Sequence, residues 1–139
     1  MRKGFDENTP RVALIVRQPG RAFNLLATLA RQGMAATLQS DPIEALRECR
    51  LNPPHLVIVE DDLGSMSGVR FLSELLKLSW TTSTILIANE SEEAVHERTE
   101  GLGILGRIRD YDDTATLHSL IEKFFSLTSQ PFSKRDDTK

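Results

Sequence analysis

The apolar positions of this chain follow two patterns, continuous runs and runs with helical spacing. A continuous apolar run rich in β-branched residues indicates a strand buried on both faces of a parallel sheet. We expect strands at residues 12–16, 34–39, 56–60, 84–88 and 104–108. After each of them, apolar residues recur three and four positions apart, which indicates a helix with one buried face. The chain therefore repeats the order strand–helix five times.

Local signals mark the ends of several predicted helices. Gly33 is placed to end the first helix in a left-handed conformation. Asp41 can cap the second helix, Pro42 suits its first turn, and Glu44 completes a pair like a capping box. Asp113 can cap the last helix in the same way. We therefore expect helix boundaries at these residues.

Five strand–helix units favour a doubly wound α/β fold. Short connections and right-handed crossovers place helices on both faces of a parallel sheet. We predict a three-layer α/β/α domain over residues 11–127, with five parallel strands in the flavodoxin-like order 2-1-3-4-5. The polar segments 1–10 and 128–139 are expected to be tails.

Composition and charge exclude several classes of protein. The chain has 139 residues, enough for one core, and a net charge of -3 that gives no reason to expect nucleic-acid or membrane binding. The only cysteine, Cys49, excludes an internal disulfide and a cysteine metal cluster. No apolar run approaches the ~20 residues that span a bilayer, and the N-terminus lacks the apolar core of a signal peptide. We therefore expect a cytoplasmic protein.

The most informative stretch runs from His55 to Gly68 and reads HLVIVEDDLGSMSG. Its apolar strand stops at three consecutive carboxylates, Glu60, Asp61 and Asp62. In open α/β sheets, ligands and chemistry gather at the carboxyl ends of the strands. These acids therefore lie where such a fold would keep its functional site.

The same stretch resembles the third strand and following loop of response-regulator receiver domains, the CheY-like family. In that family the strand ends in the aspartate that accepts a phosphoryl group, and a loop with Pro-x-Met-x-Gly follows. Met66 and Gly68 match this loop, and Glu60 stands eight positions before Gly68, where the family has its aspartate. Gly64 replaces the loop proline. The resemblance extends over about residues 10–127 through element order and the lengths between strand ends.

The resemblance implies a set of residues for phosphotransfer, and this chain departs from all of it. A working receiver holds Mg²⁺ with an acidic pair after the first strand, and contacts the phosphoryl group with a Thr or Ser and a Lys. The equivalent positions hold Arg17 and Gln18 for the acidic pair, Glu60 for the acceptor, Ala88 or Asn89 for the hydroxyl, and Asp110-Tyr111 for Lys-Pro. The resemblance thus implies a degenerate receiver with no metal, no cofactor and no enzymatic activity.

Two other interpretations stay open. Asp61 and Asp62 are alternative phosphoacceptors. Because side chains alternate along a strand, Asp61 should point away from the side that Glu60 faces, and Asp62 returns to that side only if the extended geometry continues. A flavodoxin-like binder of a small molecule or nucleotide would use the same sheet edge. Three scattered histidines have no metal-ligand spacing.

The first and third strands should be neighbours, so we expect Arg17 and Glu60 to form an ion pair across their ends. Such a pair would be a fixed substitute for the metal and the charged acceptor. A guanidinium and a carboxylate suit a bidentate contact at a partly buried site.

The predicted function is that of a pseudo-receiver, a protein-interaction module in two-component-type signal transduction. Its partner would be a signalling protein, such as a histidine kinase-related component, or a second copy of the chain. Receivers commonly signal through their fourth and fifth helices and fifth strand. In this chain that region carries Glu93, His96, Glu97, Arg107 and His118.

Overall fold

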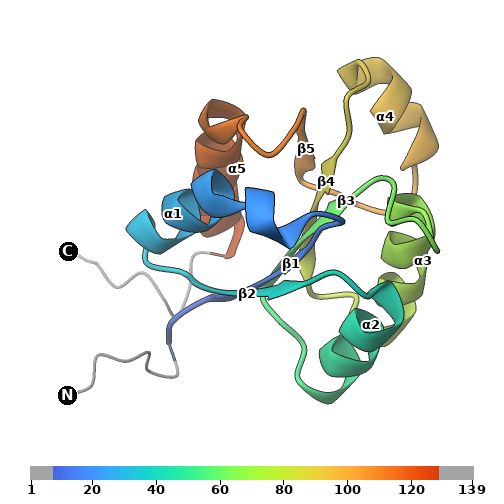
Figure 1. Ribbon diagram of the computed structural model, residues 1–139, viewed down its shortest axis with the longest axis horizontal. Helices are drawn as coiled ribbons and strands as arrows, with labels where there is room; N and C mark the ends of the chain where they lie inside the picture. The colour runs from blue at the N-terminus through green and yellow to red at the C-terminus, as the bar shows by residue number, and fades with distance from the viewer. Residues whose placement is uncertain (1–7, 129–139) are drawn as a thin grey trace.

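The computed structural model describes residues 8–128 and contains one parallel sheet of five strands in the order β2-β1-β3-β4-β5 (Figure 1). The strands are β1 (Arg11–Ile15), β2 (Ala35–Gln39), β3 (Leu56–Glu60), β4 (Ser83–Ile87) and β5 (Gly106–Ile108). The predicted strand order is confirmed, because each apolar run lies in the sheet at its expected place. Residues 1–7 and 129–139 lie outside the described chain, so the tails predicted there remain predictions.

Helices cover both faces of the sheet, as the alternating pattern predicted (Figure 1). They are the short 3₁₀ helix η1 (Pro19–Arg21), α1 (Phe23–Arg31), α2 (Pro42–Leu51), α3 (Gly68–Leu78), α4 (Glu92–Arg98) and α5 (Thr114–Thr128). In Figure 1, α1 and α5 lie together on one side, and α2, α3 and α4 lie on the other. Among residues 8–128, no helix is long and apolar enough to cross a membrane.

Strand β3 lies at the centre of the sheet and is buried along its apolar length. Leu56 and Ile58 belong to the core under α1 and α5, whereas Val57 and Val59 belong to the core with Phe71 of α3. Successive side chains of a strand point to opposite faces. The next two residues of the chain continue this alternation, and they are the first two carboxylates of the predicted site.

Several boundary signals are confirmed. Gly33 has φ 78°, the left-handed conformation expected after α1. Asp41 caps α2 by accepting from the backbone N–H groups of Ile43 at 3.0 Å and Glu44 at 3.4 Å. Asp113 accepts from the N–H of Thr116 at 3.4 Å, at the start of α5.

Two local predictions are wrong. Glu44 does not complete a capping box: its carboxylate lies 2.6 Å from the guanidinium of Arg47, and the N–H of Asp41 donates to Gln39 instead. A charged partner one turn along the helix competes with the reciprocal cap. The fifth strand begins at Gly106 instead of residue 104: Gly103 has φ 66°, a left-handed conformation that a strand does not contain, and the chain becomes regular only at Gly106.

Candidate functional site

The carboxyl ends of the parallel strands surround a hollow of about 410 Å³. Six of the predicted site residues line it, namely Gln18, Glu60, Asp61, Asp62, Ala88 and Asp110. They come from the segments that follow β1, β3, β4 and β5, so the sheet topology brings together positions that are up to 92 residues apart. These positions therefore lie together at one edge of the sheet, and the chemistry open to them depends on how each side chain is paired.

Glu60 points toward the α1 and α5 side of the sheet and is held by two neutral donors. Its Oε1 accepts a hydrogen bond from the backbone N–H of Arg17 at 2.8 Å. The same oxygen accepts from the hydroxyl of Tyr111 at 2.6 Å. Glu60 thus bridges the end of β1 and the loop before α5.

The predicted ion pair between Arg17 and Glu60 is wrong. The guanidinium of Arg17 lies 3.1 Å from the carboxylate of Asp62, and both side chains are largely exposed. Asp62 is turned toward it by the loop after β3, where its Oδ1 also accepts from the N–H of Gly64 at 2.9 Å. Glu60 therefore contacts the main chain of Arg17, and the Arg17 side chain extends to the loop after β3.

Tyr111 is the functional residue that the sequence analysis noted only as the replacement of a proline. Its hydroxyl donates to Glu60 and accepts from the backbone N–H of Gln18 at 3.0 Å. Burial, reinforced by the hydrogen bond to the Glu60 carboxylate, raises the pKa of Tyr111 to about 12. The phenol therefore stays protonated at neutral pH and remains a donor. Its signal in the sequence was a lone tyrosine in the loop after the fifth strand.

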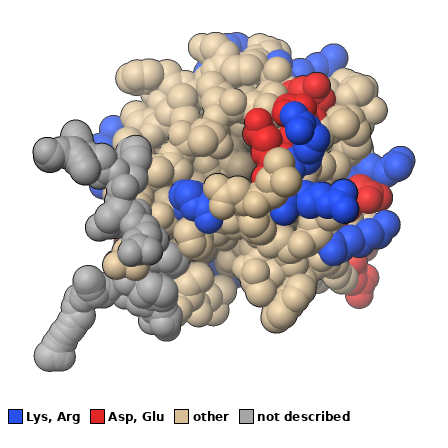
Figure 2. All heavy atoms as spheres, turned by 90° about the horizontal axis from the view of Figure 1, so that it is seen from below, with Lys and Arg blue, Asp and Glu red and all other residues tan. Residues whose placement is uncertain are grey.

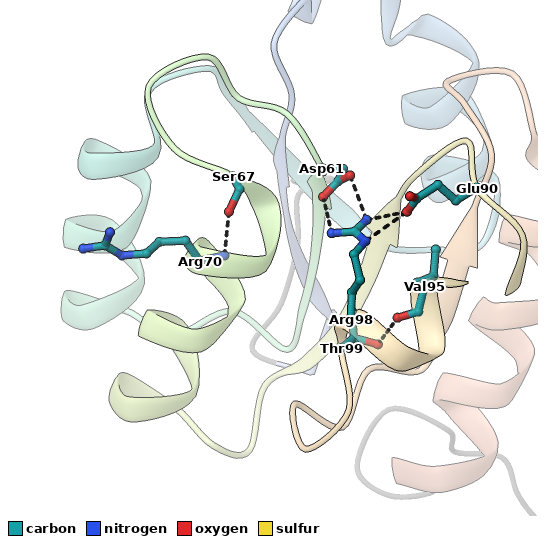
Figure 3. Close-up of polar contacts among 7 residues, drawn as sticks. All are labelled: Asp61, Ser67, Arg70, Glu90, Val95, Arg98 and Thr99. Atoms are coloured by element: carbon teal, nitrogen blue, oxygen red, sulfur yellow. Dashed lines mark hydrogen bonds and ion pairs between the residues drawn. The ribbon is translucent and has the colours of Figure 1, made fainter. Parts of the chain in front are cut away.

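Asp61 points to the opposite side of the sheet, as the strand alternation predicted. Arg98 of α4 donates to both of its carboxylate oxygens, at 2.9 and 3.4 Å (Figure 3). The same guanidinium contacts Glu90 at 2.6 Å, so it joins the ends of β3 and β4 (Figure 3). Hydrogen bonding to Glu90, and then to Asp61, raises the pKa of Arg98 above its usual value despite some burial. Neither Arg98 nor Glu90 was among the predicted site residues.

The turn after β3 is packed so closely that only glycine fits at its end. Ser67 caps α3 by accepting from the N–H of Arg70 at 3.0 Å (Figure 3). A Cβ on the next residue, Gly68, would overlap the carbonyl oxygen of Glu60 and lie 2.9 Å from Cα of Asp61. The glycine that matches the receiver loop is therefore required by the backbone that carries the two carboxylates.

The residues at this edge do not fit Mg²⁺. This cation takes carboxylate, carbonyl and water oxygens, whereas the positions after β1 hold Arg17 and Gln18. Asp61 and Asp62 are each paired with a guanidinium. Among residues 8–128, no group of three or more His, Cys, Asp or Glu side chains is arranged to hold a metal ion.

Most of the predicted interaction residues surround a second, larger hollow of about 910 Å³ between α4 and α5, over β5. Glu93, His96, Glu97 and Arg107 line it. His118 does not: it lies on α5 with its Nδ1 3.8 Å from Glu122. The Nε of Arg107 is buried and has no hydrogen-bond partner among the described residues.

No protein-family model and no curated protein matches this sequence. Solved structures of receivers do match the fold. The chemotaxis protein CheY4 of Vibrio cholerae aligns with a TM-score of 0.73 at 16% identity, over 84% of this chain and 98% of that chain. A CheY-like receiver domain protein from Methanospirillum hungatei gives 0.74 at 15% identity, over 87% and 98%. The receiver domain of Francisella response regulator 1452 gives 0.75 at 18% identity, over 86% and 99%. The chain therefore has the flavodoxin-like fold of CheY-like receiver domains.

Proposed function

We propose that this domain is an atypical receiver in two-component-type signal transduction, which binds a protein partner and is not phosphorylated by the Mg²⁺-dependent route. One observation carries the proposal. The acceptor position holds Glu60, and its Oε1 is engaged by the backbone N–H of Arg17 and the hydroxyl of Tyr111. Arg17 stands where the receiver pattern has a metal ligand, and Tyr111 stands where it has the proline after the lysine.

Two further receiver positions support the same proposal. Asp110 stands where the receiver pattern has lysine, and Ala88 offers no hydroxyl to a phosphoryl group. The cations that line the hollow, Arg21 and Arg109, stand at other positions. The bridge formed by Glu60 and Tyr111 is complete without a ligand, which suits a domain held in one state and recognised by its surface.

The direct test treats the protein with acetyl phosphate or beryllofluoride in the presence of Mg²⁺ and measures its mass and melting temperature. We expect no phosphoryl adduct and no saturable rise in melting temperature, because only a binder of the folded state stabilises it. A receiver with the complete acidic pair, aspartate and lysine, treated in parallel, checks the reagents.

Two outcomes of this test would favour the alternatives. A phosphoryl adduct that disappears in Asp61→Asn or Asp62→Asn would establish phosphorylation at a nonstandard carboxylate. A rise in melting temperature with one member of a nucleotide panel would establish a small-molecule binder.

The partner surface in this proposal is the hollow between α4 and α5. Glu93 and Glu97 supply negative charge on α4, and Arg107 supplies a positive charge from β5. Arg107→Glu and Glu97→Lys should each reduce capture of the partner from the native host, whereas His118→Ala should retain it. Equal capture by all three variants would remove this surface from the proposal.

A further inference from the structure

The two edges of the sheet differ in length and charge. Strand β5 ends the sheet on one side with three residues, of which Arg107 is charged, and Lys123 lines the same hollow. Strand β2 ends it on the other side with five residues, Ala-Ala-Thr-Leu-Gln, none of them charged and none of them proline. Natural sheets usually protect an edge with charge, proline, a bulge or short length. Strand β2 has none of these devices.

The backbone of β2 has hydrogen-bonding groups directed away from the sheet. The N–H of Ala35 donates to Pro10, and the carbonyl of Gln39 accepts from Val16, so both residues point toward β1. Backbone groups of alternate residues in a strand point to opposite edges. Ala36 and Leu38 therefore direct their N–H and carbonyl groups to the open edge.

Large apolar side chains are exposed near this edge. Figure 2 looks at the underside of the molecule in Figure 1 and shows a wide uncharged area next to a cluster of charged side chains. Leu38, Ile43 and Leu51 are exposed by 39%, 62% and 75%. A hollow of about 790 Å³ between β2 and α2 is lined by Leu38 and Leu51, and the charged residues Arg11 and Glu48 also line it. Exposed apolar surface of this kind marks interaction sites.

We propose that β2 pairs with β2 of a second copy of this chain, in an antiparallel arrangement centred on Thr37, to make one continuous sheet across the dimer. This register places Ala36 of each copy opposite Leu38 of the other copy. Both are hydrogen-bonded pairs, so each outward N–H and carbonyl of the two residues finds a partner. Thr37, which is exposed, lies opposite itself in a non-hydrogen-bonded pair.

The placement of charge along the strand favours a second copy as the occupant. Arg31 ends α1 just before β2, and Asp41 caps α2 just after it. Both residues are exposed. An antiparallel pairing places a positive residue of one copy and a negative residue of the other at each end of the paired strands. This surface is separate from the partner surface between α4 and α5, so the two can be occupied together.

A cysteine cross-link tests the register directly. Residues opposite one another in a non-hydrogen-bonded antiparallel pair have Cα atoms about 4.5 Å apart, within the range that a disulfide spans. In a Cys49→Ala background, Thr37→Cys should form a disulfide-linked dimer under mild oxidation. Leu38→Cys is the matched control. Residue 38 of one copy lies diagonally across the strand pair from residue 38 of the other, at about 7–8 Å, so these two cysteines should link poorly. The Cys49→Ala parent should stay unlinked.

Sedimentation velocity across a concentration series measures the association itself. The natural chain should form a dimer, and Leu38→Lys should raise its dissociation constant by about tenfold or more, because it places a charge on the edge. Arg31→Glu should weaken the dimer, because it replaces an attraction by a repulsion. Added salt should then strengthen the association of this variant, whereas it should weaken that of the natural chain. A monomer at all concentrations, or equal cross-linking of Thr37→Cys and Leu38→Cys, would overturn the proposal. Circular dichroism melting of each variant establishes that it is folded.

Discussion

Glu60 and Asp61 are consecutive carboxylates at one strand end, yet their surroundings have little in common. Glu60 faces α1 and α5 and is held by a backbone N–H and a partly buried phenol. Asp61 faces α4 and is held by the guanidinium of Arg98, at a site where both side chains are about one third exposed. Glu60 joins the end of β1 to the loop before α5 through neutral donors, whereas Asp61 makes a surface ion pair.

The difference follows from the strand and from solvent. Alternation along β3 sends the two side chains to opposite faces. A hydrogen bond with a buried partner is costly to lose, because the remaining group stays desolvated. An exposed ion pair is screened, and each partner returns to water when the other is removed. The two acids should therefore differ in their contribution to stability.

The largest loss of stability should come from a change at Gly68, which packs against the backbone of both Glu60 and Asp61. Gly68→Ala places a Cβ against the backbone of Glu60 and Asp61, and we expect a loss of about 3 kcal/mol in the free energy of unfolding. Gly20→Ala is the matched control, since a Cβ there meets nothing within 4 Å, and its change should stay within about 0.5 kcal/mol. Urea denaturation measures both. Similar losses in the two variants would contradict the close packing at Gly68.

The comparison itself is tested by Glu60→Ala against Asp61→Ala. We expect Glu60→Ala to cost about 2 kcal/mol, because it leaves the N–H of Arg17 and the hydroxyl of Tyr111 without their acceptor. Asp61→Ala should cost less than about 1 kcal/mol. Glu60→Gln keeps an acceptor oxygen and should lie between them. A larger loss for Asp61→Ala would reverse the assignment of the two roles.

The phenol gives the Glu60 side a pH dependence in the alkaline range. The pKa of Tyr111 rises from its ordinary value of 10.0 to about 12 in the folded chain. The unfolded chain ionises first, so this contribution to stability is fully present below pH 10 and is lost as the pH rises through about 12.

Two measurements check that prediction. Tyr111 is the only tyrosine, so the ultraviolet absorbance of tyrosinate follows it alone. Tyr111→Phe should cost about 1 kcal/mol at neutral pH and should flatten the alkaline loss of stability. An ordinary tyrosine titration in the folded protein would show that the hydroxyl is not held as described.

On the Asp61 side, Arg98→Ala should cost only about 0.5 kcal/mol, and the effect should shrink in high salt. Its guanidinium joins Asp61 and Glu90, so the loss should be coupled to Asp61→Ala in a double-mutant cycle. A salt-independent loss would indicate that Arg98 acts through packing of α4 instead of charge.

The smallest effect should come from Arg17. Its pair with Asp62 joins side chains that are 52% and 75% exposed, and the coupling should stay below about 0.5 kcal/mol. Arg17→Ala and Glu60→Ala should be additive, because Glu60 contacts only the backbone of Arg17. Strong coupling between these two variants would restore the side-chain pair that the sequence suggested.

Sequence patterns alone determined the frame of this protein. The apolar runs predicted the five strands and their order, and the alternation along β3 predicted that Glu60 and Asp61 face opposite sides. Asp41, Asp113 and Gly33 were assigned correctly as helix boundaries. These properties are local: each depends on a few neighbouring residues and on the fixed geometry of a strand or a helix end.

Only the tertiary structure decided the partners of the carboxylates. Tyr111 lies 51 residues from Glu60, and Arg98 lies 37 residues from Asp61. Arg17 contacts Asp62 instead of Glu60 because the loop after β3 turns that aspartate toward it. Long side chains on loops and helix ends have several acids within reach, and the choice among them depends on how the assembled backbone places each donor. Sequence spacing carries no record of that placement.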